Sequence, residues 1–170
     1  MQADELAKEL KKIQIDCIYC SPFLRTLQTV YPYCVVTEQK VNIENAFYEP
    51  LDDNVFNRYN YRHRVADLAD SYPHLLRVVD SGYKSTVFVS NIRCKETEVQ
   101  VTNRVFPFIC NICCMNKGSG KTFLIVTHGT ICNAIKKFFN DKVELSDHFP
   151  EGKYEIIDVD VDWKSRFITE

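Results

Sequence analysis

The sequence predicts a layered α/β fold, and three features of its 170 residues carry that prediction. Short runs rich in β-branched and aromatic residues alternate with longer stretches of helical periodicity, the order that builds a sheet covered by helices. Residues 122–127 form a continuous apolar run, which is typical of a strand buried on both faces. The length and the 45% apolar, 26% charged composition fit one domain over residues 1–170.

The chain opens with an amphipathic helix, because apolar residues recur at helical spacing over residues 3–13 while lysines occupy the other face. Residues 15–20 are short and rich in strand formers, so we expect a strand there. A Ser-Pro pair follows and supplies an N-cap and a first-turn proline, which predicts a helix from Pro22. We expect that helix to end near Pro32, because an internal proline removes a backbone hydrogen bond.

The middle of the chain contains weaker patterns. A second strand is predicted over residues 41–47, with Glu49 just past its end. Residues 57–70 have helical periodicity and residues 72–90 are irregular. Residues 97–115 form a longer helical stretch despite β-branched residues and an internal proline. This part therefore adds one strand and two helices to the predicted fold.

The last third of the chain holds the apolar strand and the helix after it. A glycine-rich turn at residues 117–120 leads into the strand over residues 122–127. A histidine and a glycine follow at once, and residues 131–139 then predict a helix. Residues 154–161 alternate apolar and acidic side chains, which predicts a half-exposed strand.

Composition argues against several classes of partner. A net charge of −2 gives no overall attraction to nucleic acid or anionic lipid, so we expect neither nucleic acid nor a membrane as a partner. No stretch approaches the roughly 18 consecutive apolar residues of a membrane span, and no signal peptide is recognisable, so a soluble, cytoplasmic protein is expected. In that compartment thiols stay reduced. We therefore expect no disulfide among the eight cysteines, at positions 17, 20, 34, 94, 110, 113, 114 and 132.

Side chains suited to phosphate stand at predicted strand ends, where open α/β sheets bind ligands. Arg25 lies one turn into the helix predicted from Pro22. Its planar guanidinium is suited to pair with two phosphate oxygens. His128 and Gly129 stand at the second junction, where the histidine donates to a phosphoryl oxygen and the helix start offers backbone N–H groups. Glu49 follows a third strand and serves as a general acid if burial or a nearby anion raises its pKa. Together these residues predict phosphoryl chemistry.

The order of these residues resembles the histidine phosphatase (phosphoglycerate mutase-like) superfamily. Residues 16–29, Asp-Cys-Ile-Tyr-Cys-Ser-Pro-Phe-Leu-Arg-Thr-Leu-Gln-Thr, are similar to its Ser-Pro-Leu-x-Arg-x-x-Gln-Thr segment. Residues 127–129, Thr-His-Gly, resemble its second histidine motif, and residues 47–49, Phe-Tyr-Glu, fall where it keeps an acid/base glutamate. The order and spacing agree over about residues 3–154, which is nearly the whole chain.

The resemblance implies a three-layer sandwich with a mostly parallel central sheet flanked by helices. It also assigns roles: Glu49 and His128 as catalytic residues, Arg25, His128 and Gly129 as phosphate ligands, and Ser21 and Thr127 as supports. It implies no metal and no cofactor. The expected partner is a phosphorylated small molecule or a phosphoprotein.

The first strand of the family is the main departure. There, a histidine within an Arg-His-Gly motif attacks phosphorus and becomes a phosphohistidine, while the glutamate protonates the leaving oxygen. This sequence contains no Arg-His-Gly, and His63, His74 and His148 lie in polar or irregular stretches without the strand arginine and the following glycine of that motif. We therefore expect an N-terminally truncated domain or pseudo-enzyme that is inactive as written. Because the family's first strand is central to its sheet, its loss is expected to leave backbone groups unpaired.

Residues after the glutamate favour a phosphatase over a mutase. Residues 49–52, Glu-Pro-Leu-Asp, and residues 68–73 are similar to the protein-tyrosine and broad-specificity phosphatases named for suppressing T-cell receptor signalling. Residues 58–64, Arg-Tyr-Asn-Tyr-Arg-His-Arg, are either a solvated helix face or a substrate-facing lid. The rival function is a non-catalytic module that uses Arg25 and His128 to hold a phosphorylated ligand or a partner protein.

Two further motifs have ordinary explanations. Residues 118–122, Gly-Ser-Gly-Lys-Thr, lack the glycine that a nucleotide-binding loop needs at the position of Met115, and they precede a strand instead of following one. A plain turn is expected there. Cysteines recur within residues 17–20 and 110–114, but the gap between these segments far exceeds the spacing of a zinc ribbon. Buried thiols are therefore expected at both.

Overall fold

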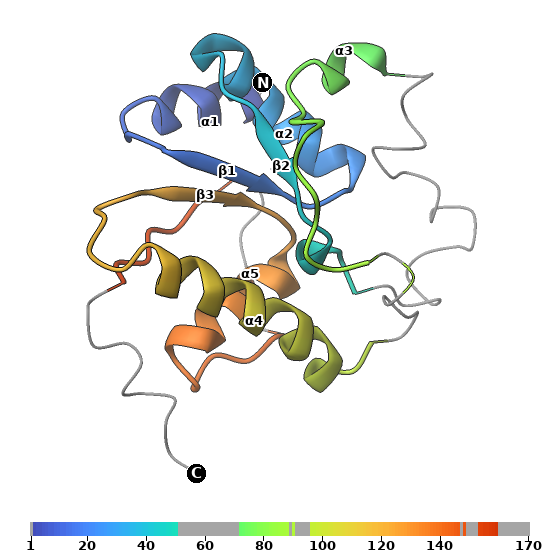
Figure 1. Cartoon of the computed structure of the whole chain (residues 1–170), viewed down its shortest axis with the longest axis vertical. Coiled ribbons are helices and arrows are strands. Elements are labelled where there is room, and N and C mark those ends of the chain that lie inside the picture. The colour runs from blue at the N-terminus through green and yellow to red at the C-terminus, as the bar shows by residue number, and fades with distance from the viewer. Residues whose placement is uncertain are drawn as a thin grey trace.

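The chain has an α/β architecture in the computed structural model, which describes residues 2–50, 72–88, 90, 96–146, 148 and 153–159. Three parallel strands, β1 (Cys17–Cys20), β2 (Val41–Ile43) and β3 (Phe123–Val126), form a sheet in the order β2-β1-β3. The helices α1 (Gln2–Leu10) and α2 (Leu24–Thr37) cover one face, and α4 (Glu98–Met115) and α5 (Gly129–Phe139) cover the other (Figure 1). The predicted parallel sheet flanked by helices is confirmed.

The strand β1 separates two hydrophobic cores. Ile18 and Cys20 are buried in the core under α1 and α2, whereas Tyr19 between them packs against the core under α4 and α5. Successive residues of a strand point to opposite faces of a sheet, so one short strand contributes to both cores. The same alternation occurs in β3, where Ile125 lies on the Tyr19 side.

Hydrogen bonds pair β1 on both sides. Ile18 lies opposite Val41 of β2 and opposite Leu124 of β3, all in parallel register. The outer side of β2 is covered as well, because Val41 exchanges backbone hydrogen bonds with residues 78–80. Among the described strands β1 thus has two neighbours, whereas β3 stands at one end of the order and pairs with β1 alone.

The helix α2 continues past Pro32, where the sequence predicted its end. It runs to Thr37, and Glu38 then closes it in the left-handed conformation with φ of 57°. Beyond the proline, Tyr33 and Cys34 are buried in the core. Burying a large apolar side chain contributes about 1.5–3 kcal/mol, which offsets much of the roughly 3 kcal/mol cost of an internal proline.

The strand predicted over residues 41–47 is shorter, because the 3₁₀ turn η1 (Asn45–Phe47) replaces its second half. The fully buried Glu44 promotes this turn, since its carboxylate accepts the backbone N–H of Ala46 at 2.8 Å. The same carboxylate accepts hydrogen bonds from a later segment, at Tyr83, Ser85 and Thr86. One buried side chain therefore ends the strand and holds that segment against it.

The helix α4 begins with a reciprocal cap. The Thr97 side chain accepts the backbone N–H of Gln100, and the Gln100 side chain accepts the backbone N–H of Thr97. As predicted, the helix passes through Pro107. The turn after it contains Gly118 and Gly120 at φ of 72° and 68°, a region that favours glycine.

The structure differs from the sequence prediction at α3, at β3 and over residues 153–159. The short helix α3 (Pro73–Leu76) forms within residues 72–90, which were expected to be irregular. The β3 side chains are half-buried instead of fully buried, because β3 stands at one end of the described strand order. Residues 153–159 contain no strand, and an ion pair between Lys136 and Glu155 links them to α5.

The predicted helix over residues 57–70, with its arginine-rich segment, lies outside the described residues. In α4, Cys114 is exposed and Cys110 and Cys113 are half-buried, where buried thiols were expected. Among the described helices, none is long and apolar enough to cross a bilayer.

Candidate functional site

Three segments bring Arg25, Glu49 and His128 together at the carboxyl ends of β1 and β3. Arg25 lies in the first turn of α2, Glu49 follows η1, and His128 comes two residues after β3. Nη2 of Arg25 lies 2.9 Å from Nδ1 of His128 and forms an ion pair with Oε2 of Glu49. That carboxylate oxygen is 3.7 Å from the same imidazole nitrogen. The structure thus brings these three predicted site residues into direct contact.

Both ring nitrogens of His128 are engaged. A guanidinium only donates hydrogen bonds, so Nδ1 facing Arg25 must accept and carries no proton. Nε2 then carries the proton and donates to Oγ of Ser21 at 2.8 Å. Burial, followed by the charges of Arg25 and Arg104, lowers the pKa of His128 to about 3. The imidazole is therefore neutral near pH 7, and its N–H is directed to Ser21 rather than toward a phosphoryl oxygen.

The Phe23 side chain packs against both the arginine and the histidine of the site. The Phe23 ring lies edge-on to the imidazole of His128, with centroids 5.0 Å apart, and edge-on to Tyr48 at 4.8 Å. The guanidinium carbon of Arg25 lies 4.9 Å from the centroid of the same ring. A cation over an aromatic face is stabilised by the ring quadrupole. Phe23 thus restricts both the arginine and the histidine.

The two predicted supporting residues, Ser21 and Thr127, form hydrogen bonds to His128 and to the backbone before Glu49. Ser21 is fully buried and accepts the His128 hydrogen bond. Thr127 donates from Oγ1 to the carbonyl of Phe47 at 3.0 Å, two residues before the glutamate. Gly129 is the first residue of α5, and the N-cap His128 makes no side-chain capping bond. The positive end of the α5 dipole therefore lies beside the imidazole.

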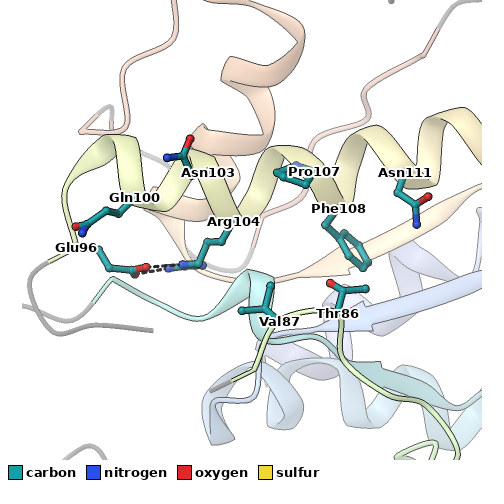
Figure 2. A pocket seen from close by; sticks show the side chains of 9 residues that line it. All are labelled: Thr86, Val87, Glu96, Gln100, Asn103, Arg104, Pro107, Phe108 and Asn111. Atoms are coloured by element: carbon teal, nitrogen blue, oxygen red, sulfur yellow. Dashed lines mark hydrogen bonds and ion pairs between the residues drawn. The ribbon is translucent and has the colours of Figure 1, made fainter. Parts of the chain in front are cut away.

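A second arginine, outside the set predicted from the sequence, holds the backbone that carries Glu49. Arg104 of α4 is buried and donates to the carbonyls of Ala46 and Tyr48. Its Nε and Nη2 also donate to both carboxylate oxygens of Glu96, at 2.8 and 2.6 Å (Figure 2). This guanidinium therefore fixes the chain immediately before the glutamate of the site.

The sequence does contain a signal for this arginine. Arg104 shares a helical face with Val101, Val105 and Phe108, all of which are buried. A cation in an apolar stripe requires a buried partner, because burying an unpaired charge is very costly. That position alone indicates an internal ion pair, although it does not name the partner.

A cavity of about 590 Å³ lies along α4, outside the predicted site. Its lining includes Asn103, Pro107 and Phe108 of α4 and Val87 of the facing segment (Figure 2). Arg104 also lines it. Arg104 therefore contacts both the cavity and the backbone that precedes Glu49.

The other histidines do not add to this arrangement in the described part of the chain. His74 belongs to α3, and its ring packs against Tyr31 and Tyr72, with centroids 5.6 and 6.2 Å away. His63 lies outside the described residues, and His148 follows α5. Within the described ranges, no group of three His, Cys, Asp or Glu side chains is arranged to hold a metal ion.

A family model and similar solved structures both relate this chain to phosphatases. The model of the histidine phosphatase superfamily (branch 1) matches residues 1–156. The structure is similar to that of the ecdysone phosphate phosphatase EPPase from Bombyx mori in complex with tungstate, with a TM-score of 0.64 and 16% identity. That match covers 91% of this chain and 61% of the Bombyx mori chain, so this chain spans less than two thirds of that protein.

Two further phosphatase structures are similar. The mycobacterial glucosyl-3-phosphoglycerate phosphatase matches with a TM-score of 0.53 and 17% identity, over 96% of this chain and 68% of its own. The alpha-ribazole phosphatase from Shigella flexneri matches with a TM-score of 0.51 and 18% identity, over 82% of this chain and 64% of its own. At these identities the likeness shows a shared fold. A search of curated protein sequences found no match.

Proposed function

The chain belongs to the histidine phosphatase superfamily, and on that premise we propose that these 170 residues bind the phosphate group of a phosphomonoester without carrying out the phosphohistidine reaction. The observation that carries the proposal is the contact among Arg25, Glu49 and His128 at the ends of parallel strands. The ligand is a phosphorylated small molecule or a phosphoprotein. The chain then acts as a phosphate-dependent binding module.

Among the three contacting residues of the site, Arg25 supplies the positive charge. His128 is neutral at physiological pH, so it contributes no net charge toward an anion. The Arg25 side chain is 51% exposed, which leaves its guanidinium accessible from solvent. A phosphate group that pairs with both edges of this guanidinium shares it with Glu49 or displaces that carboxylate. The N-terminal end of α5 adds a favourable dipole beside the bound anion.

Glu49 shares its arginine with the proposed anion. A phosphate dianion and the Glu49 carboxylate held at the same guanidinium repel each other, so phosphate binding is favoured when the anion displaces that carboxylate.

Two observations support binding without turnover. The sequence contains no Arg-His-Gly, the motif that carries the nucleophile in the family reaction. The remaining imidazole at the site has its Nδ1 lone pair covered by Arg25 and its Nε2 bonded to Ser21. These two contacts favour a binding role for His128 over attack on phosphorus. The tungstate complex of the Bombyx mori phosphatase supports oxyanion binding by this fold.

The test combines turnover and binding on the purified 170-residue chain. We expect no hydrolysis of p-nitrophenyl phosphate above background, and a rise in melting temperature on addition of inorganic phosphate. Arg25→Gln removes the charge and should abolish the rise. Arg77→Gln, at the end of α3, is the matched control and should keep it.

Two results would contradict the proposal. Hydrolysis that disappears in His128→Ala would show that a histidine of this chain catalyses the reaction after all. A melting temperature that phosphate does not change, in a chain whose circular dichroism shows folded helices, would show that the site does not bind the anion.

A further inference from the structure

The segment that follows α3 is held in place by one buried carboxylate. Glu44 comes directly after β2 and is fully buried, and its carboxylate accepts hydrogen bonds from Tyr83 at 2.6 Å and Ser85 at 2.7 Å. It also accepts the backbone N–H of Thr86 at 3.0 Å. Burial, followed by the hydrogen bond to Glu44, raises the pKa of Tyr83, so its hydroxyl keeps its proton and donates. These contacts hold residues 83–87, here named the strap, at the end of β2.

The strap also binds the turn η1 directly. Oγ of Ser85 accepts the backbone N–H of Asn45 at 2.9 Å, and the Asn45 side chain donates to the carbonyl of Val87 at 2.8 Å. The Glu44 carboxylate accepts the backbone N–H of Ala46 from the same turn. The start of η1 is therefore fixed by the strap and by Glu44.

The other end of η1 is held by two further elements. Arg104 of α4 donates to two carbonyls of this segment, and Thr127, just after β3, donates to a third. Together they bond the peptide carbonyls of residues 46–48, which directly precede Glu49. An anion carried on such a fixed backbone loses less freedom on pairing with a cation than an anion that arrives from solution.

The side chain that this backbone carries is an anion at the proposed phosphate ligand. The Glu49 carboxylate forms its ion pair with Nη2 of Arg25, the group to which the proposed function assigns the phosphate. Two anions at one guanidinium repel each other. The internal carboxylate and a phosphate from solution therefore compete for Arg25.

We propose that the phosphate site is autoinhibited: the strap and Glu44 hold η1 so that the Glu49 carboxylate occupies Arg25 in place of the anion. This regulation rests on the proposed function, because it acts on the same phosphate site. Release of the strap from Glu44 loosens η1 and lets Glu49 leave the guanidinium. Phosphate binding is then stronger.

The test measures the dissociation constant of inorganic phosphate from the melting temperature of the 170-residue chain, at pH 8 and constant ionic strength. Glu49→Gln keeps the size of the side chain and removes the competing charge, so we expect phosphate to bind roughly tenfold more tightly. Glu9→Gln, in α1, is the matched control for the loss of one negative charge. It should bind phosphate as the unmodified chain does.

A strap variant separates this regulation from a general effect on structure. Tyr83→Phe removes one hydroxyl that donates to Glu44 and keeps the ring that packs against Tyr19. It should tighten phosphate binding about threefold when Glu49 is present. Combined with Glu49→Gln it should add nothing, because no competing carboxylate remains to be released. Circular dichroism checks that every variant keeps its helices.

The outcomes distinguish autoinhibition from phosphate binding itself. Equal affinities of the unmodified and Glu49→Gln chains, or weaker binding by the variant, would overturn autoinhibition and leave the proposed function in place. The same gain from Tyr83→Phe with and without Glu49 would show that the strap does not act through that carboxylate. No stabilisation by phosphate in any folded variant would contradict the proposed function, and its regulation with it.

Discussion

Two Arg–Glu ion pairs contact the segment around Glu49, and their side chains differ in exposure to solvent. In the pair of Arg25 and Glu49 the side chains are 51% and 20% exposed, whereas in the pair of Arg104 and Glu96 they are 8% and 4% exposed. The first pair lies at the carboxyl ends of the strands and contacts the imidazole. The second lies under α4 and bonds to two backbone carbonyls.

The difference in exposure gives the two ion pairs different roles. An exposed ion pair contributes little to stability, because water and salt screen it, and either partner can exchange it for a ligand. A buried pair has lost its hydration and is costly to break, so it persists and fixes what it touches. The first pair is therefore suited to binding, and the second to holding Glu49 in place.

The largest effect is expected from Arg104→Met. The substitution leaves Glu96 buried without its cation and leaves the carbonyls of Ala46 and Tyr48 without their donor. Breaking a buried pair from one side costs about 3–5 kcal/mol. Urea denaturation should show a loss of this size in the free energy of unfolding.

The double variant Arg104→Met/Glu96→Leu is the control for that measurement. Removing both charges removes the unpaired carboxylate, so part of the lost stability should return. A loss below about 1 kcal/mol in the single variant would mean that the buried pair behaves like a surface pair, and the division would fail.

The next effect is a pH dependence of stability that arises at His128, where burial and two nearby arginines disfavour the charged imidazole. Burial, then Arg25, then Arg104 lowers its pKa from 6.5 to about 3. Between these values the unfolded chain binds a proton that the native imidazole does not, so the free energy of unfolding falls as the pH decreases. The expected slope from this group is about 1.4 kcal/mol per pH unit. Above pH 6.5 its contribution is constant.

Denaturation of the unmodified chain and of His128→Gln at pH 7, 6 and 5 measures this slope. The glutamine variant should show a flatter dependence over that range, because glutamine does not titrate. Equal slopes in the two proteins would contradict the lowered pKa, because the native imidazole would then take up the proton as readily as the unfolded chain does.

The smallest effect on stability is expected from Arg25→Gln. Its pair with Glu49 is half-exposed, so the free energy of unfolding should change by less than about 1 kcal/mol. The variant should nevertheless lose the stabilisation by phosphate. Loss of several kcal/mol in the absence of phosphate, measured by the same urea titration, would assign a structural role to Arg25 and remove the contrast with Arg104.

Local chemistry explains which parts of the site were predictable. The Ser-Pro helix start and the Thr-His-Gly after an apolar run are patterns of adjacent residues, and they located Arg25 and His128 correctly at strand ends. Glu49 was identified by its place after a strand and by the family resemblance. Its contact with Arg25 required the adjacency of the junctions, which sequence cannot show.

The features that the sequence missed depend on contacts between distant residues. The helix α2 passes Pro32 because the side chains beyond it are buried against other elements. The second strand ends at Ile43 because Glu44 caps the following turn and bonds to a segment about forty residues later. Glu96 and Arg104 are close along the chain, but the carbonyls to which Arg104 donates belong to η1 and the residue after it. Such partners are not encoded in local periodicity.

The alternation of side chains along β1 has a consequence for the opening motions of the molecule. Ile18 serves one core and Tyr19 the other, and the amides of this strand lie between two hydrogen-bonded neighbours. Separating either layer of helices from the sheet exposes one side of β1, and breaking the strand exposes both. We expect the β1 amides to exchange with deuterium only through global unfolding, as a single cooperative unit, while the outer edge of β3 exchanges through smaller local fluctuations.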